Sequence, residues 1–379
     1  MPASLWTGAF LDDMRQQGDA EADGAVAQLY ATGEVGAVDA LLKTLVLNDG
    51  IPPEGLPPVI AEYLARTSKL APLDQSKVRR GERLFGALGP EMLLALGFYS
   101  LPAAYAARKG VQVLYRTGYL LNRPVRRVFE TTQMVVDVMA HDGLAPDGKG
   151  VRTAQKVRLL HAAIRHLLTH DPKNPWDPTL GVPLNQEDLA GTLSVFGYVV
   201  LDGLSRLGIA VADEDREAYV HVWSAVGRIL GLREELIPAS FAESKQLAEV
   251  VYKRQIAPSP EGAAMANALV DGLQTIMPHA LHGLPASLVH FFLDDDPFTH
   301  QNIAAMLQVP PADWTETVAR VVGAVGNLLE RISSDLDPAA RLIRHASRAL
   351  VAGMLRVERG GRRSPFSIPP DLADEWKIV

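Results

Sequence analysis

Apolar residues recur every three to four positions along most of this chain from Gly24 onward, which is the spacing of helices with one buried face. Segments in which β-branched and polar residues alternate, as in half-buried strands, do not occur in the sequence. We therefore expect an all-α fold. The pattern predicts helices over residues 74–88, 90–107, 124–140, 151–171, 186–207, 213–232, 241–256, 260–276, 285–293, 314–333 and 339–355.

Prolines and glycines divide the chain into three parts. Residues 1–75 predict short helices, interrupted by four prolines between residues 52 and 58, that form an N-terminal helical arm or lid. Residues 76–360 predict a single large multi-helix domain, and residues 361–379 predict a C-terminal tail.

Individual residues mark the ends of several helices. Pro124 suits a first helical turn, because the backbone N–H that proline lacks would be unpaired there. Asn185 is a good N-cap, and the acidic residues Glu187 and Asp188 that follow it oppose the helix dipole. Gly208 is well placed to close the same helix.

Two segments bear on membranes and location. The uncharged stretch Met92–Ala107 contains Gly97 and Pro102, which predicts a kinked, buried helix, and it is shorter than the roughly 20 residues needed to span a bilayer. The first 17 residues lack a basic segment followed by an apolar core. We therefore expect a cytoplasmic protein without a transmembrane segment.

Composition removes several classes of function. The formal net charge of the 379 residues is −7 and the arginines are scattered, so a nucleic acid is not an expected partner. Cysteine is absent, which excludes thiolate nucleophiles, iron–sulfur clusters and covalently attached haem. The sequence also lacks a phosphate-binding glycine loop, a Gly-x-Ser-x-Gly motif, a His-Glu-x-x-His motif and a Glu-x-x-His motif. It leaves the oligomeric state open.

The histidine at position 161 is the most informative residue. It lies at the edge of an apolar helical stripe formed by Val157, Leu160, Ile164 and Leu168. Arg158 and Arg165 project near the same edge, where they could pair with the propionates of a b-type haem whose iron His161 would bind. The alternative is a core histidine whose nitrogens are satisfied by other protein groups.

A second candidate surface lies on the helix that begins at Pro124. Arg127 and Thr131 are four residues apart, and an apolar strip that includes Met134 continues the same face. This face could lie against a haem plane. The alternative is a surface arginine beside a threonine inside a helix.

Three motifs then occur in a fixed order: Arg127-x-x-x-Thr131, the segment from Lys156 to Arg165 that contains His161, and the segment from Gly181 to Thr192. Together they resemble the family of latex clearing proteins and MpaB-like oxygenases, over roughly residues 75–300. The resemblance implies an all-helical fold with a globin-like core, non-covalent haem b, and cleavage of an isoprenoid carbon–carbon double bond with dioxygen.

The same resemblance assigns roles to particular residues. His161 would be the iron ligand, and Arg127 and Thr131 would lie beside the haem. Arg165 matches the arginine one turn after the ligand, and on the charge argument above both Arg158 and Arg165 would face propionates. From helix faces we expect Thr192, Phe196 and Met134 to line the pocket opposite His161.

The distal side departs from the rubber-cleaving members. They carry a lysine just before the threonine, where this chain has Glu130, and they carry an upstream glutamate where residues 108–116 here contain no acid. Rubber is therefore not the substrate that the sequence favours. Glu130 is a candidate distal base, or it is simply solvated or paired with Arg126 or Arg127.

Three functions follow as hypotheses. The first is a haem b oxygenase that uses dioxygen on a lipophilic, unsaturated, isoprenoid-like substrate, with Arg127, Glu130 and Thr131 as catalytic candidates. The second is a haem peroxidase or hydroperoxide-rearranging enzyme in which Glu130 assists O–O cleavage. The third is a cofactor-free helical protein that binds a lipid or a partner on the same scaffold.

Overall fold

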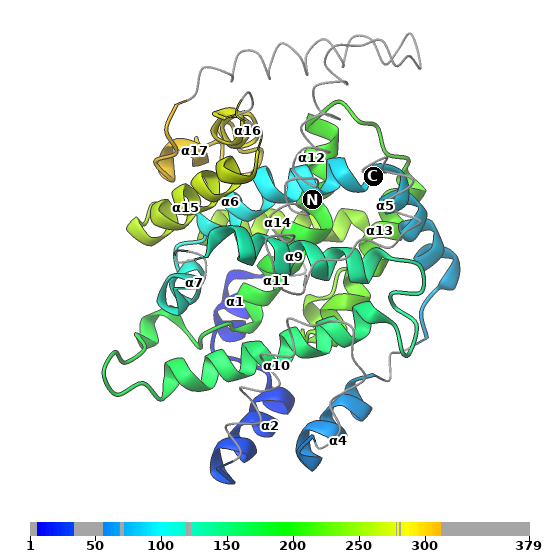
Figure 1. Cartoon of the computed structure of the whole chain (residues 1–379), viewed down its shortest axis with the longest axis vertical. Coiled ribbons are helices and arrows are strands. Elements are labelled where there is room, and N and C mark those ends of the chain that lie inside the picture. Colours follow the sequence, from blue (N-terminus) through cyan, green and yellow to red (C-terminus); the bar gives the residue numbers. More distant parts are fainter. Residues whose placement is uncertain are drawn as a thin grey trace.

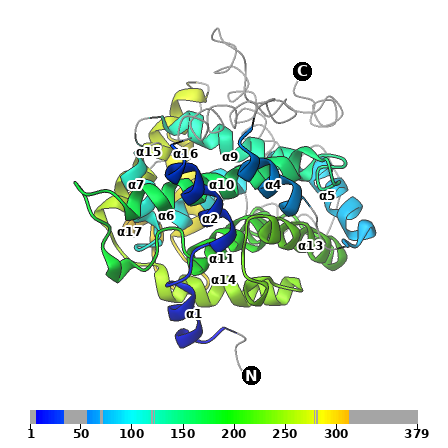
Figure 2. The same ribbon diagram turned by 90° about the horizontal axis from the view of Figure 1, so that it is seen from below.

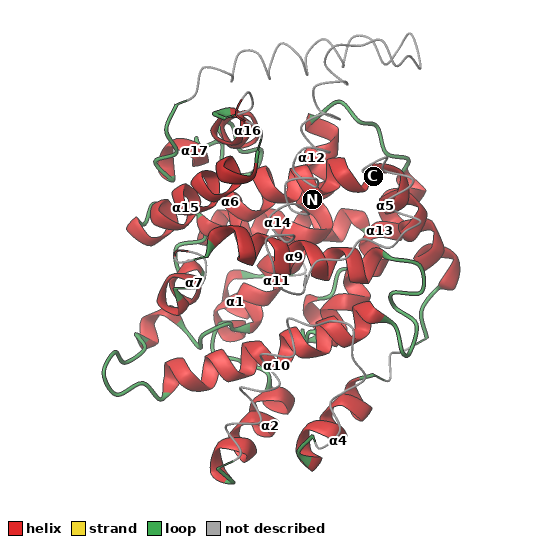
Figure 3. Cartoon of the chain, viewed as in Figure 1, coloured by secondary structure: helices red, strands yellow, loops and turns green. Residues whose placement is uncertain are grey.

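The computed structural model describes residues 6–33, 56–68, 72–118, 121, 123–277, 279 and 282–311. Within these ranges the regular elements are helices, apart from one isolated bridge between Ala107 and Ile256 (Figure 3). The prediction of an all-α fold is confirmed. The helices predicted over residues 314–333 and 339–355, and the tail 361–379, lie outside the described residues.

The described elements follow one another in this order: α1 (Gly8–Met14), α2 (Ala20–Ala31), α4 (Pro58–Thr67), α5 (Gln75–Ala95), the π-helical η1 (Leu96–Ser100), α6 (Leu101–Tyr105), α7 (Val111–Thr117), α9 (Pro124–Met139), α10 (Lys149–Thr169), the 3-10 helix η2 (Pro178–Leu180), α11 (Gln186–Ser194), the π-helical η3 (Val195–Val199), α12 (Val200–Arg206), α13 (Asp213–Ile229), the 3-10 helix η4 (Glu234–Leu236), α14 (Phe241–Gln255), α15 (Pro260–Ile276), α16 (Leu284–Leu293) and α17 (Ile303–Met306).

The centre of the molecule is one long helix, formed by α5, η1 and α6 without interruption and packed against α13, α12 and α16 (Figure 1). The prediction that a helix ends near residue 88 was wrong, because the backbone continues as a helix through Pro90. The turns around Pro90 are buried, and packing outweighs the local cost of a proline. Among the described residues this helix alone is long and apolar enough to cross a membrane, but most of its apolar window is buried inside the protein, as in a core helix.

The helix predicted over residues 186–207 consists of α11, η3 and α12. The side chain of Asn185 accepts a hydrogen bond from the N–H of Asp188, which confirms the predicted N-cap, and Gly208 follows the last turn with φ of 78°. The π-helical turns η1 and η3 lie against each other in the core. Such turns often occur near functional sites.

The N-terminal helices are packed into the body. Helices α2 and α4 cover one side of α10, as the views in Figures 1 and 2 agree. The contact forms a second, smaller apolar cluster that consists of Ala22, Ala25, Val26, Leu29, Ile60, Tyr63, Leu159, Ala162 and Ala163. Leu11 and Met14 of α1 join the main core, and the indole nitrogen of Trp6 donates to the carbonyl oxygen of Glu235 at 2.7 Å.

The close approach of α12 to α5 generates a stability prediction. A Cβ atom on Gly203 would lie 2.7 Å from the Cβ atom of Ala95, so the Gly203→Ala substitution forces the two helices apart. We expect it to lower the free energy of unfolding by about 1–3 kcal/mol, as measured by urea denaturation.

The matched control is Gly24→Ala on α2, where a new Cβ would meet nothing within 4 Å. That helical position is exposed, so alanine should raise the free energy of unfolding by about 0.5–1 kcal/mol. Equal effects of the two substitutions would show that the contact between α12 and α5 is not tight.

Candidate functional site

His161 occupies the middle of α10, which packs against α9 on one side. Its Nδ1 atom is buried and has no hydrogen-bond partner, and among the described residues Nε2 makes no hydrogen bond either. The structure therefore does not show a core histidine whose nitrogens are satisfied by protein groups. An imidazole whose nitrogens make no hydrogen bond is able to act as a ligand.

The charge state of the ring suits the same role. The pKa of His161 is lowered from 6.5 to about 3, first by burial and then by the positive charges of Arg165 and Arg127, with Asp19 acting in the opposite direction. The ring is therefore neutral at neutral pH. Neutral imidazole is the form that binds a metal.

The apolar stripe around His161 is left only partly covered. Val157, Leu160, Ile164 and Leu168 are all half-buried, as His161 is, while the side of α10 that faces α2 and α4 is closed by tight packing. A half-covered apolar face with a histidine at its edge can accept a flat, apolar group such as a porphyrin.

Arg165 has an unusual set of partners. Its Nε atom lies 2.8 Å from Oδ1 of Asp23, and its Nη1 atom donates to the carbonyl oxygen of Leu184 at 2.8 Å. The side chain is only 4% exposed, and its Nη2 atom is buried without a hydrogen-bond partner. A buried, unfilled donor on a cation is costly, so this atom is well placed to receive an anionic group.

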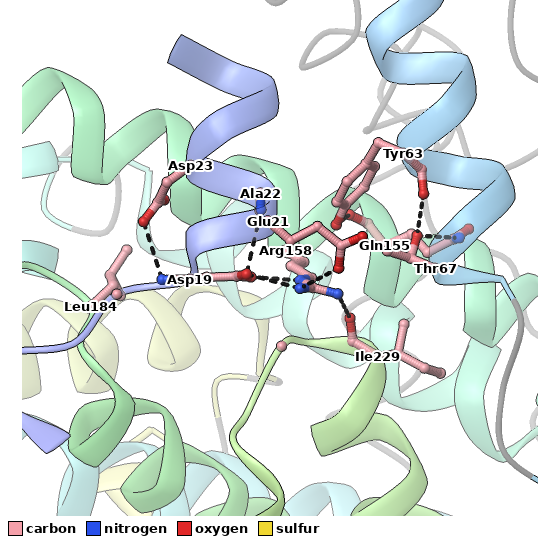
Figure 4. A network of polar contacts seen from close by, with 12 residues as sticks. Asp19, Glu21, Ala22, Asp23, Tyr63, Thr67, Gln155, Arg158, Leu184 and Ile229 are labelled. Atoms are coloured by element: carbon pink, nitrogen blue, oxygen red, sulfur yellow. Dashed lines mark hydrogen bonds and ion pairs between the residues drawn. The ribbon is translucent and has the colours of Figure 1, made fainter. Parts of the chain in front are cut away.

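Arg158 is different, because all of its donor nitrogens are engaged. The carboxylate of Asp19 binds Nε and Nη2, the latter at 2.8 Å, and Oε2 of Glu21 lies 3.0 Å from Nη2 (Figure 4). The carbonyl oxygen of Ile229 accepts from Nη1 at 3.5 Å. Most of the donors of Arg158 thus bind Asp19, Glu21 and Ile229, and only Nη1 keeps an N–H without a partner, so its role at a propionate stays a prediction.

On α9, Arg127 is the residue whose charge acts on His161. The hydroxyl of Thr131 donates to the carbonyl oxygen of Arg127 at 3.1 Å, so it is satisfied within its own helix. Oε1 of Glu130 lies 3.1 Å from Nε of Arg126, and Oε2 lies 3.6 Å from Nη1 of Arg127. The carboxylate of Glu130 is thus paired with both arginines, and its role as a distal base stays a prediction.

The residues predicted to line the distal pocket have other contacts. Phe196 is buried in η3 and stacks on Trp223, with ring centroids 4.8 Å apart. Thr192 is exposed, and its hydroxyl donates to the carbonyl oxygen of Asp188 at 2.9 Å. None of these contacts involves His161, so the role of Thr192 and Phe196 in a pocket stays a prediction.

The sequence reasoning missed three residues that bear on the site. Tyr105, at the end of α6, is buried, and the Arg127 charge that acts on His161 also acts on its hydroxyl. Asp19 and Asp23 bind the two arginines that flank His161. No spacing rule could reveal them, because each lies far in the sequence from the arginine on which it acts or which acts on it, and only folding brings the two together.

The fold and the site together define a class, namely all-helical proteins that carry a neutral histidine on a partly covered apolar helix face. The structure of latex clearing protein in the closed state shares this fold with a TM-score of 0.76 and 26% sequence identity, covering 96% of this chain and 100% of that chain.

The family model described as "ER-bound oxygenase mpaB/B'/Rubber oxygenase, catalytic domain" matches residues 81–296, and the chain belongs to this family. A rubber oxygenase from Streptomyces sp. (strain K30) is 32% identical over 261 residues, which are 66% of this chain and 62% of that protein. The matched part thus spans less than two thirds of the relative. The resemblance inferred from the three motifs is confirmed.

The lowered pKa of His161 predicts a specific pH response. Its folded-state pKa of about 3 lies below the value of 6.5 for an unperturbed histidine, so the unfolded chain binds more protons between these values. Stability from this residue is complete above about pH 6.5 and is lost as the pH falls towards 3. In nuclear magnetic resonance spectra, the His161 ring should stay neutral down to about pH 4.

The His161→Gln variant assigns the ring signals, because they disappear from its spectra. A titration midpoint near 6.5 for those signals would show that the imidazole is solvated, and would remove the physical basis for treating it as a deeply placed ligand.

Proposed function

We propose that this protein is a haem b-dependent oxygenase that uses dioxygen to cleave a carbon–carbon double bond of a lipophilic, isoprenoid-like substrate. The observation that carries the proposal is the environment of His161. Its ring is neutral, its nitrogens make no hydrogen bond, and it lies on a half-covered apolar face beside Arg165, which has an unfilled donor.

The residues present fit haem b in three respects. His161 would bind the iron through a ring nitrogen that makes no hydrogen bond. The Nη2 atom of Arg165 would pair with a propionate. Leu160 and Ile164 would contact the macrocycle from the same helix face. Haem bound there would supply the iron centre at which dioxygen is used.

The substrate class rests on two supports. The family and the relative from Streptomyces are named as oxygenases, the latter as a rubber oxygenase. The residues predicted to lie opposite His161 include Met134 and Phe196, which are apolar and buried and so favour a substrate that is itself apolar. We therefore propose an unsaturated isoprenoid chain as the substrate.

The contacts of Glu130 give the peroxidase alternative less support than the oxygenase. A carboxyl that assists O–O cleavage must be poised in a water-poor site. Glu130 instead pairs with Arg126 and Arg127, and its side chain is 29% exposed. Peroxide chemistry and a cofactor-free binding protein are therefore outcomes that the experiments below would reveal.

Haem binding is the first test. Purified wild-type protein titrated with haemin should develop a Soret band that shifts when carbon monoxide is added to the dithionite-reduced form. The His161→Ala variant should bind haem at least about tenfold more weakly, because the iron ligand is lost. The control is His166→Ala, which changes a histidine on the same helix that stacks on Tyr30 and His170.

Circular dichroism must show both variants to be folded before they are compared. The proposal fails if the wild type develops no Soret band at excess haemin, which would favour the cofactor-free binding protein. It fails equally if folded His161→Ala retains full haem affinity.

Turnover is the second test. Squalene and short polyisoprene oligomers, incubated with loaded enzyme under ¹⁸O₂, should give carbonyl-terminated fragments that carry ¹⁸O, as detected by mass spectrometry. Turnover that requires added peroxide and proceeds without dioxygen would instead identify the peroxidase or hydroperoxide-rearranging enzyme.

A further inference from the structure

Three carboxylates at the start of α2 reach the helix that carries His161. Asp19 is the N-cap of α2, and Glu21 and Asp23 stand in its first turn. Asp19 and Glu21 bind Arg158, which is three residues before His161, and Asp23 binds Arg165, which is four residues after it. Helix α2 thus forms ion pairs with α10 at one residue before the candidate ligand and at one residue after it.

The two arginines are held in different ways. Each of the three guanidinium nitrogens of Arg158 (Nε, Nη1 and Nη2) has at least one hydrogen-bond partner (Figure 4). Arg165 has partners for Nε and Nη1 only, and the buried Nη2 has none. A planar guanidinium fixed at two nitrogens cannot rotate, so the direction of Nη2 is set by Asp23 and by the carbonyl oxygen of Leu184.

Asp23 is itself held firmly. Its Oδ2 atom accepts a hydrogen bond from the backbone N–H of Asp19 at 3.1 Å, while Oδ1 receives Arg165 (Figure 4 shows the first of these bonds). Asp19 in turn caps α2 by accepting from the N–H of Ala22. The carboxylate is therefore part of the helix start and does not depend on a free rotamer.

We propose that Asp23 is a positioning residue of the His161 site: it fixes the guanidinium of Arg165 so that Nη2 is kept for an acidic group of the prosthetic group. This inference rests on the proposed function, since it assigns the acidic group to a haem propionate. Asp23 does not touch the haem and acts through Arg165 alone.

The test is the haem dissociation constant from Soret titration, measured for the Asp23→Ala and Asp23→Asn variants. Asp23→Ala releases Nε of Arg165 and should weaken haem binding about tenfold, the usual size of an effect exerted through a neighbouring group. Asp23→Asn keeps an oxygen acceptor at Oδ1 and should restore most of the affinity.

Glu21→Ala is the matched control. Its carboxylate stands in the same turn and is equally exposed, at 37% against 36% for Asp23, but it binds Arg158 and Arg66 instead of Arg165. We expect its haem affinity to equal that of the wild type.

A double-mutant cycle separates positioning from a general effect on the fold. In an Arg165→Met background, Asp23→Ala should cause no further loss of haem affinity, because the residue through which it acts is gone. Additive losses, or wild-type affinity in Asp23→Ala, would overturn the inference and leave the proposed function standing. A wild-type protein that binds no haem overturns the proposed function, and the inference falls with it.

Discussion

The burial of two arginines on α10 is the constraint on which the rest of the site depends. Arg158 and Arg165 are 9% and 4% exposed at their side chains, and a buried cation without a counter-charge is strongly destabilising. The carboxylates at the start of α2 satisfy this requirement. They therefore determine where the N-terminal helices lie, and they turn the small residues Ala162 and Ala163 of α10 towards α2.

Once that side of α10 is closed, His161 must face the other way. The helical period places it with Val157, Ile164 and Leu168 on the face that α2 and α4 do not cover. The nearby charges then act on the pKa of its ring, which Arg165 and Arg127 lower and Asp19 raises. The packing of α2 and α4 against α10 thus sets the direction, the exposure and the charge state of His161.

The prediction of local structure succeeded where a residue acts on its immediate neighbours. The cap at Asn185, the helix start at Pro124 and the end at Gly208 all depend on groups a few positions away, and the structure has each of them. The prediction failed at Pro90, where the surrounding core keeps the helix intact at a position that disfavours it locally. Burial on several sides is not visible in a local pattern.

The site divides in the same way. The sequence by itself determined the all-α fold, the family, and the apolar stripe with His161 at its edge, because periodicity and motif spacing are properties of neighbouring positions. Only the tertiary structure decided that Arg158 pairs with Asp19 while the Nη2 atom of Arg165 has no partner. It also decided that Glu130 pairs with Arg126. A guanidinium binds whichever acceptor folding brings to it, and Asp19 lies 139 residues from Arg158 along the chain.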